Sequence, residues 1–134
     1  MILIDANILM YAAGASHPNK APSVAWLGRV AKGEIQAAVD AGTLQEILHR
    51  YRALGRWQDG RRVYDPTRRL VPSVLAVTAD IVDETRDLLD RCPALVARDA
   101  VHAAVVRVLG LDAICSYDRD LDAVPGLRRV EPPL

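Results

Sequence analysis

The sequence predicts a three-layer α/β fold, with a central parallel sheet of four or five strands between two layers of helices. Short apolar runs alternate with longer segments of helical periodicity along the 134 residues, a pattern typical of parallel sheets covered on both faces. The first run, residues 1–4, is wholly apolar, as in a strand buried on both faces. No internal repeat or low-complexity tract divides the chain, so we expect one domain over residues 1–134.

The expected strands are short apolar runs that end at charged or turn-forming residues. After residues 1–4, the run 35–39 ends at Asp40. A third strand is expected within 71–77, after Pro72, because proline is tolerated only at the start or edge of a strand. Residues 111–116 supply a fourth strand, and 127–130 a possible edge strand.

Helical periodicity is expected in most of the segments between these strands. Residues 8–11 form the first turns of one helix, and Gly42-Thr43 opens another whose apolar residues recur at helical spacing. Residues 56–70 suggest a helix that is interrupted or ended near Asp65-Pro66. Two further helices are expected over 78–90 and 93–109, and Gly110 stops the second of them.

Composition and charge exclude several classes of protein. The formal net charge is zero, which argues against a protein that coats nucleic acid by charge alone. Cys92 and Cys115 are too few and too far apart for a disulfide-stapled secreted domain. No signal peptide is visible, and no apolar run approaches the roughly 20 residues of a membrane span. We therefore expect a cytoplasmic protein with no membrane partner.

Four carboxylates stand at positions where ligands bind in parallel sheets. Asp5 ends the first strand, Glu46 is expected in the first turn of the helix after the second strand, Asp99 lies in the 93–109 helix, and Asp118 follows the fourth strand. All four can reach the carboxyl-terminal edge of one sheet. Grouped acids repel one another, and a divalent cation resolves that repulsion. A set of oxygen ligands suits Mg²⁺ or Mn²⁺.

Each of these acids also has a structural explanation, and that explanation is weakest for Asp5. Thr43-Leu44-Gln45-Glu46 fits a capping box, in which the glutamate bonds back to the start of the helix. Asp99 could be a first-turn acid favoured by the helix dipole, and Asp118 could be a turn residue. His102 lies one turn after Asp99, so it could contact the site, but a histidine on an apolar helix is more often a packing residue.

Four motifs together resemble a known family. They are Ile4-Asp5-Ala6-Asn7-Ile8-Leu9, Leu44-Gln45-Glu46-Ile47-Leu48, Arg98-Asp99-Ala100-Val101-His102-Ala103-Ala104 and Ser116-Tyr117-Asp118-Arg119-Asp120-Leu121. In this order and at these separations, they resemble the acidic motifs of PIN domains over nearly the whole chain. The short single domain is most similar to the VapC-type toxins of bacterial toxin–antitoxin pairs. Leu121 and Ala6 depart from the commonest pattern, but neither removes a carboxylate.

The resemblance implies a Mg²⁺- or Mn²⁺-dependent endoribonuclease. It implies Asp5, Glu46, Asp99 and Asp118 as catalytic acids. It also implies metal ligation by Asp5, Asp99 and Asp118, with Asp120 as a fifth acid of the site and with Asn7 and Ser116 orienting these acids. A PIN-like RNA-processing nuclease without an antitoxin and an inactive PIN-like interaction module remain alternatives. A phosphoacceptor signalling domain would need a lysine after a late strand, and the only lysines are Lys20 and Lys32.

Partner surfaces are expected in two places. Residues 50–69 hold seven arginines and two aspartates, a net charge of +5, so Arg50, Arg61, Arg62 and Trp57 are candidates for binding RNA. The same segment could instead be a solvated helical hairpin or contact a protein. The resemblance also implies a homodimer, for which the residues around Trp26, Leu27 and Val30 are a candidate patch. It further implies a cognate antitoxin whose basic tail enters the acidic groove.

Overall fold

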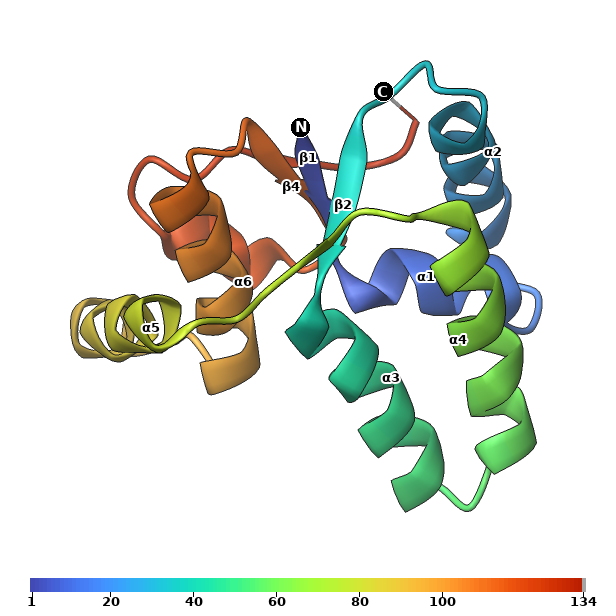
Figure 1. The fold of residues 1–134 in the computed structure, drawn as a ribbon, viewed down its shortest axis with the longest axis horizontal. Helices are drawn as coiled ribbons and strands as arrows, with labels where there is room; N and C mark the ends of the chain where they lie inside the picture. Colours follow the sequence, from blue (N-terminus) through green and yellow to red (C-terminus); the bar gives the residue numbers. More distant parts are fainter. Residues whose placement is uncertain (134) are drawn as a thin grey trace.

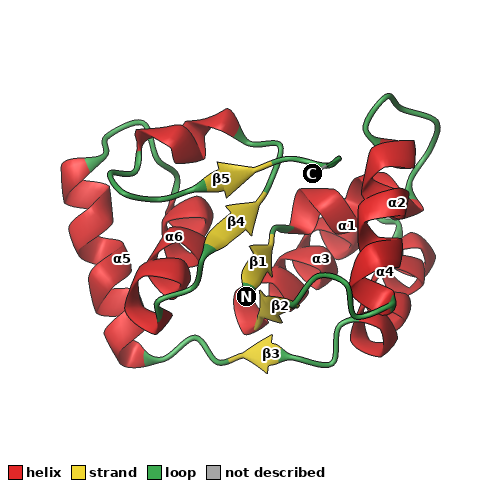
Figure 2. Ribbon diagram, turned by 90° about the horizontal axis from the view of Figure 1, so that it is seen from above, coloured by secondary structure: helices red, strands yellow, loops and turns green. Residues whose placement is uncertain are grey.

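The computed structural model describes residues 1–133, and in this range five parallel strands form one sheet in the order β3-β2-β1-β4-β5. The strands are β1 (Ile2–Ile4), β2 (Ala37–Asp40), β3 (Val74–Leu75), β4 (Ala113–Cys115) and β5 (Arg129–Val130). β1 is central and pairs with β2 on one side and β4 on the other (Figure 2). The predicted parallel sheet is therefore confirmed.

The helices lie in two layers, one on each face of the sheet (Figure 1). One layer contains α1 (Ala6–Ala13), α2 (Lys20–Ala31), α3 (Ala41–Ala53) and α4 (Trp57–Leu70). The other contains α5 (Ala79–Arg91) and α6 (Ala97–Leu109), and a short 3₁₀ helix, η1 (Arg119–Ala123), follows β4. This arrangement confirms the three-layer α/β fold.

Each strand supplies side chains to two separate cores, because successive residues of a strand point to opposite faces. Leu3 and Ile114, which are partners in the register of β1 and β4, pack in the core beneath α5 and α6. Their neighbours Ile4 and Cys115 pack in the core beneath α1 to α4. The apolar runs of the sequence are thus explained by burial on both faces.

Helix α2 was not among the expected helices, and its position removes Trp26 and Leu27 from the predicted dimer patch, whereas Val30 is half-buried. Pro22 and Gly28 lower the helix propensity of this segment. Pro22 is tolerated because it lies in the first turn, where its missing N–H costs no helical hydrogen bond. Trp26 is only 1% exposed and Leu27 is 7% exposed, since both belong to the core beneath α1 to α4. These side chains are therefore unavailable for an interface with a second copy.

Three helix boundaries differ from the sequence prediction. α3 begins at Ala41, because the Asp40 carboxylate caps it by accepting a hydrogen bond of 2.8 Å from the Thr43 N–H. α6 begins at Ala97 rather than at Pro93. α4 continues through Pro66 without interruption. Proline removes one helical hydrogen bond there, but the buried Val63 and Thr67 hold both sides of it in the core.

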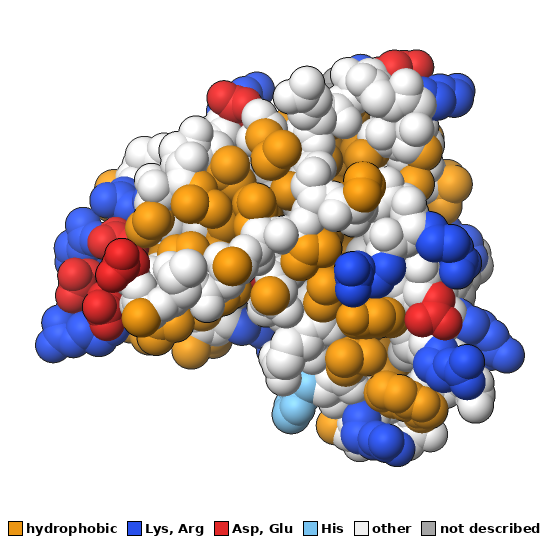
Figure 3. All heavy atoms as spheres, viewed as in Figure 1, with side chains coloured by type: hydrophobic (Ala, Val, Ile, Leu, Met, Phe, Trp, Pro, Cys, Tyr) orange, Lys and Arg blue, Asp and Glu red, His pale blue; other side chains and the backbone are white. Residues whose placement is uncertain are grey.

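The hairpin of α3 and α4 depends on a close approach at Gly60. A Cβ atom at this position would lie 2.7 Å from the Cβ of Tyr51 on α3, so only glycine fits. Basic groups spread over the surface of this hairpin (Figure 3). All seven arginines of residues 50–69 are exposed. Across residues 1–133, no helix combines the length and the apolar character that crossing a bilayer would require.

Candidate active site

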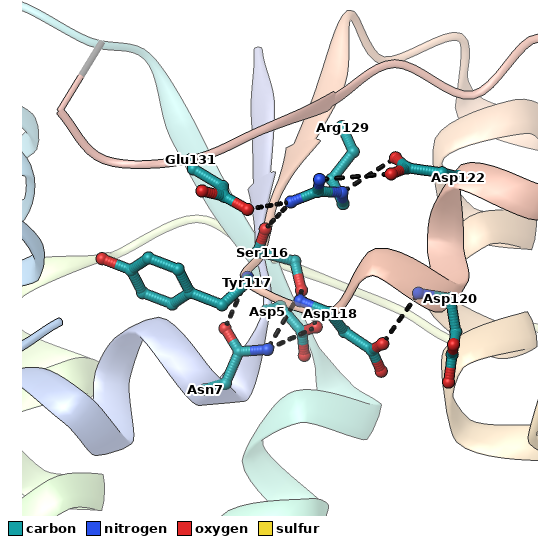
Figure 4. A network of polar contacts seen from close by, with 9 residues as sticks. All are labelled: Asp5, Asn7, Ser116, Tyr117, Asp118, Asp120, Asp122, Arg129 and Glu131. Carbon is teal, nitrogen blue, oxygen red and sulfur yellow. Dashed lines mark hydrogen bonds and ion pairs between the residues drawn. The ribbon is translucent and has the colours of Figure 1, made fainter.

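The candidate site lies where the three central strands end. Asp5 follows β1, Asp40 is the last residue of β2, and the segment from Ser116 to Asp118 follows β4. Because the strands are parallel, their carboxyl ends meet at one edge of the sheet, which is where ligands bind in such folds. Figure 4 shows the carboxylates of Asp5 and Asp118 pointing in the same direction from this edge.

Asp5 is 5% exposed and is held by two neighbouring polar side chains. Its Oδ2 accepts hydrogen bonds of 2.6 Å from the Ser116 hydroxyl and 3.3 Å from the Asn7 amide. The same amide donates to Ser116 Oγ at 3.0 Å, so the three residues form a closed triangle (Figure 4). Burial raises the pKa of Asp5, against the opposing influence of His102 and of the Ser116 hydrogen bond.

The loop that carries Ser116 and Asp118 is fixed from its other side by Arg129 of β5. Arg129 Nη1 donates to the backbone oxygen of Ser116 at 2.9 Å and to the Glu131 carboxylate at 2.6 Å. Its Nε donates to Asp122 at 2.8 Å (Figure 4). A guanidinium presents several donors in a rigid plane. Arg129 therefore ties the end of β4 to η1.

Glu46 lies in the second turn of α3, so the predicted first-turn position and the capping box are both wrong. The cap is Asp40, and Glu46 is too far along the helix to reach the free N–H groups at its start. Its Oε1 instead forms an ion pair of 2.9 Å with Arg98. Its Oε2 is buried without a hydrogen-bond partner among the described residues. Helix capping therefore does not explain why a glutamate stands at position 46.

Asp99 and Asp118 interact directly with each other. Asp99 is in the first turn of α6 but is only 5% exposed. Burial, a hydrogen bond with Asp118 and repulsion from Asp118 and Asp5 raise the pKa of Asp99 to about 7. Asp118 also caps η1 by accepting from the Asp120 N–H at 3.0 Å. Asp120 is exposed and reaches Asp118 through its backbone.

The structure adds two residues to the site that the sequence analysis did not assign to it, Asp40 and His102. His102 is 1% exposed, and its Nδ1 lies 2.6 Å from Asp40 Oδ2. Its Nε2 lies 3.7 Å from Glu46 Oε2 and 4.0 Å from Asp5 Oδ1. Burial lowers the pKa of His102, but the hydrogen bond with Asp40 and the nearby carboxylates of Glu46 and Asp5 outweigh it and raise that pKa well above its usual value.

The pKa of Asp40 is shifted in the opposite direction to that of His102. Burial raises its pKa, but the hydrogen bonds from His102 and Thr43 hold it below its usual range. The pattern that marked Asp5, an acid at the end of a buried strand, also applies to Asp40 and could have identified it. His102 had only its spacing from Asp99 as a signal, and the structure shows that it contacts the site rather than serving in packing alone.

The donor atoms fit a divalent cation. Within residues 1–133, Asp5, Glu46 and His102 each offer one ligand atom, and these atoms all lie within 4.8 Å of one another. Glu46 Oε2 and His102 Nε2 are buried without hydrogen-bond partners in this part of the chain. Buried polar atoms are rarely left unpaired. Of the residues expected to hold metal, Asp5 belongs to this group, and Asp99 and Asp118 lie beside it.

The candidate RNA-binding residues lie on the α3–α4 hairpin. Arg50 lines a hollow of about 420 Å³ together with Asn7, Tyr11 and His17, so it adjoins the site. Arg61 and Arg62 line a separate hollow of about 340 Å³ on α4. Trp57 lies 4.6 Å beneath the guanidinium of Arg52. The structure thus brings Arg50 near the acids and leaves the other three candidates farther along the hairpin.

Comparisons with known proteins agree with this geometry. A family model for the PIN domain matches residues 2–127. The chain is 39% identical over 130 residues to Ribonuclease VapC13 of Mycobacterium tuberculosis, covering 97% of this chain and 99% of that protein.

Solved structures that share the fold include the following two. The first is VapC20 of Mycobacterium tuberculosis, described as a sarcin-ricin loop cleaving toxin, with a TM-score of 0.77 at 19% identity over 98% of this chain and 100% of that chain. The second is a toxin–antitoxin complex from Klebsiella pneumoniae, with a TM-score of 0.66 at 18% identity over 95% of each chain. The resemblance in the sequence motifs is confirmed, and the chain belongs to the PIN domain family.

Proposed function

We propose that this chain is a metal-dependent endoribonuclease and the toxin of a VapC-type toxin–antitoxin pair. The observation that carries the proposal is the meeting of Asp5, Glu46, Asp99 and Asp118 at one sheet edge, where burial and repulsion from Asp118 and Asp5 raise the pKa of Asp99 to about 7. Such repulsion is costly unless a cation compensates for it. Among its relatives, Ribonuclease VapC13 is similar over nearly the whole chain.

We assign Mg²⁺ or Mn²⁺ as the cofactor, held by the carboxylates of Asp5, Glu46, Asp99 and Asp118, with Asp120 beside them. When bound, such an ion lowers the pKa of water and offsets negative charge on the phosphate. Ser116 and Asn7 orient the Asp5 carboxylate through the hydrogen bonds described above. Arg50 lines the hollow beside Asn7, and in this proposal it pairs with an RNA phosphate.

The test is cleavage of end-labelled RNA by the purified chain, with Mg²⁺ or Mn²⁺ and with EDTA as the control. We expect cleavage with either cation and none with EDTA. Asp5→Asn should abolish cleavage while the fold survives, because removing one acid relieves repulsion. The matched control is Asp87→Asn, an exposed acid on α5. An intact wild-type chain that cleaves no RNA with either cation would leave the inactive interaction module as the explanation.

We propose a cognate antitoxin as the protein partner, with a basic tail that enters the acidic site. The supporting likeness is to the fold of a protein in a toxin–antitoxin complex. A lysine or arginine from the partner would compensate for the grouped carboxylates when metal is absent. We also propose a cytoplasmic homodimer, as in the VapC-type toxins that the motifs resemble.

Co-expression with the product of the adjacent gene tests the partner proposal. Size determination should show a complex, and the nuclease assay should show inhibition by the partner. A monomeric chain that cleaves RNA but neither binds that product nor is inhibited by it would instead be a PIN nuclease without an antitoxin.

A further inference from the structure

Asp40 and His102 form a buried pair directly behind the acids of the site. Asp40 is fully buried at the end of β2, and His102 is 1% exposed on α6. The 2.6 Å contact joins Asp40 Oδ2 to Nδ1 of the ring. The opposite ring nitrogen, Nε2, is therefore directed away from Asp40 and toward Asp5 Oδ1 and Glu46 Oε2, at 4.0 and 3.7 Å.

The Nε2 atom of His102 lacks a hydrogen-bond partner within residues 1–133, and so does Glu46 Oε2 opposite it. Both atoms are buried, and both belong to the three-residue group whose donor atoms lie within 4.8 Å of one another. A histidine side chain that serves only in packing would satisfy both of its nitrogens. His102 Nε2 and Glu46 Oε2 thus face each other without hydrogen-bond partners, and the Asp5 carboxylate lies beside both of them. Together, these three donor atoms form a site suited to a cation.

We propose that His102 Nε2, Asp5 and Glu46 ligate the divalent cation together, and that this mixed nitrogen and oxygen set selects Mn²⁺ over Mg²⁺. The inference rests on the proposed metal-dependent function and adds a nitrogen ligand to the acidic site. Asp40 is a positioning residue that acts through His102.

The Asp40 contact prepares His102 for this role. A neutral imidazole carries one N–H and one lone pair, and the partner of one nitrogen decides which nitrogen keeps the proton. A carboxylate only accepts, so Asp40 holds the proton on Nδ1 and leaves the lone pair on Nε2. Carboxylate–histidine–metal arrangements of this kind fix the orientation of a ligating ring.

The nitrogen donor explains the expected choice of metal. Mg²⁺ is hard, prefers oxygen ligands and retains several waters. Divalent transition metals accept imidazole, and their affinities follow a series in which Mn²⁺ binds least tightly. A site built from oxygen donors alone would lack this reason to bind Mn²⁺ more tightly than Mg²⁺. The Mn²⁺ preference of the chain should therefore depend on His102.

Electron spin-echo spectroscopy of bound Mn²⁺ tests the inference directly. Nitrogen coupling from a coordinated imidazole should appear in the wild-type protein, and its frequencies should change when the protein is labelled with ¹⁵N-histidine. His49→Gln is the matched control, since His49 lines the same hollow of about 300 Å³ as Glu46 and His102 but is exposed. His49→Gln should keep the coupling, and His102→Gln should lose it.

Asp40→Asn separates the proposed role of Asp40 from a structural one. An asparagine oxygen still caps α3 by accepting from Thr43 N–H. Its amide group would then donate to His102 Nδ1 and move the ring proton to Nε2, where it blocks ligation. We expect Asp40→Asn to fold, as judged by circular dichroism, and to lose the nitrogen coupling.

Calorimetric titration supplies the second measurement. His102→Gln should weaken Mn²⁺ binding by about 10- to 100-fold and Mg²⁺ binding by a much smaller factor, so that the two affinities converge. Mn²⁺ that binds to the wild-type protein without nitrogen coupling would overturn the inference, whether or not RNA is cleaved. Nitrogen coupling in a chain that cleaves no RNA would remove the proposed function and leave the metal site in place.

Discussion

The hydroxyl of Ser116 donates a 2.6 Å hydrogen bond to the carboxylate of Asp5, joining residues 111 positions apart in the sequence. The bond links the end of β4 to the end of β1, and Arg129 holds the same loop from behind through the Ser116 carbonyl group. Ser116 also accepts from the Asp118 N–H at 3.0 Å. One hydroxyl therefore sets the relative positions of two of the acids.

Ser116→Ala should weaken metal binding without unfolding the chain. The substitution removes a hydrogen bond that favours the charged form of Asp5 and frees its carboxylate to rotate. Loss of such a supporting contact typically lowers metal affinity about 10-fold or more. The measurement is the Mg²⁺ concentration that gives half-maximal RNA cleavage, with the exposed Ser16→Ala as the control. An unchanged concentration in Ser116→Ala would show that Asn7 alone orients Asp5.

Glu46→Gln distinguishes a catalytic acid from a structural one. Because Asp40 caps α3, the substitution leaves the start of the helix intact. Glutamine also keeps the size of the side chain, and the ion pair with Arg98, whose own side chain is 61% exposed, contributes little stability. We expect cleavage to fall by at least about 100-fold, in the range of a lost charge contact in an active site, with thermal unfolding nearly unchanged. Normal cleavage by this variant would remove Glu46 from the site.

The sequence motifs located the acids but did not reveal how they are supported. Asp5, Glu46, Asp99 and Asp118 each lie in a short local motif, so they can be recognised one at a time. The pairing of Asp40 with His102 spans 62 positions and depends on tertiary packing, which no local pattern encodes.

The same distinction applies to the fold. The strands and most helices follow from their apolar periodicity. Helix α2 could not be predicted in this way, because its proline and glycine lower the helix propensity of the segment. The helix is stabilised instead by burial of Trp26 and Leu27. The start of α3 lies one residue before the predicted one, because Asp40, the last residue of β2, also caps the helix.

Metal-free stability should fall as the pH rises, and Asp99→Asn should reduce that fall. The folded chain raises the pKa of Asp99 from its ordinary value of 3.8 to about 7. Between these values the native state binds more protons than the unfolded state, so the free energy of unfolding decreases with rising pH. His102, whose pKa is also raised, acts in the same direction because its stabilising contacts are lost as it deprotonates.

Urea unfolding in EDTA at pH 5 and pH 8 measures this effect. The full shift of Asp99 corresponds to at most about 4 kcal/mol, and we expect Asp99→Asn to stabilise the metal-free protein at pH 8 by about 2 kcal/mol. Added Mg²⁺ should stabilise the wild type more than the variant. If the variant is less stable than the wild type at pH 8, the repulsion inferred for Asp99 and Asp118 does not exist.

Gly60→Ala should destabilise the α3–α4 hairpin, although alanine is the better helix former. The added methyl group would lie 2.7 Å from the Cβ of Tyr51, an atom that cannot move without its helix. Overpacking of this kind costs about 1–3 kcal/mol. Gly28→Ala on α2 is the matched control, because a Cβ there meets nothing within 4 Å. Chemical denaturation should show a loss for the first variant and none for the second.

The arginines of residues 50–69 should bind RNA through its phosphates. All seven are exposed, and Arg50 and Arg56 line the hollow that also contains Asn7. Arg61 and Arg62 are next to each other on α4, and Arg62 forms an ion pair of 3.1 Å with Asp59. The double variant Arg61→Ala with Arg62→Ala should weaken RNA binding. It should also lower the slope of the logarithm of affinity against the logarithm of salt concentration by up to about two, because each lost phosphate contact removes nearly one unit.

The control removes two arginines from α5 on the opposite layer, Arg86→Ala with Arg91→Ala, and should leave the slope unchanged. Fluorescence anisotropy with an uncleaved RNA, measured over a range of salt concentrations in the Asp5→Asn background, supplies both slopes. Equal slopes in the two double variants would assign Arg61 and Arg62 to a protein contact, and would leave Arg50 as the arginine that engages the substrate.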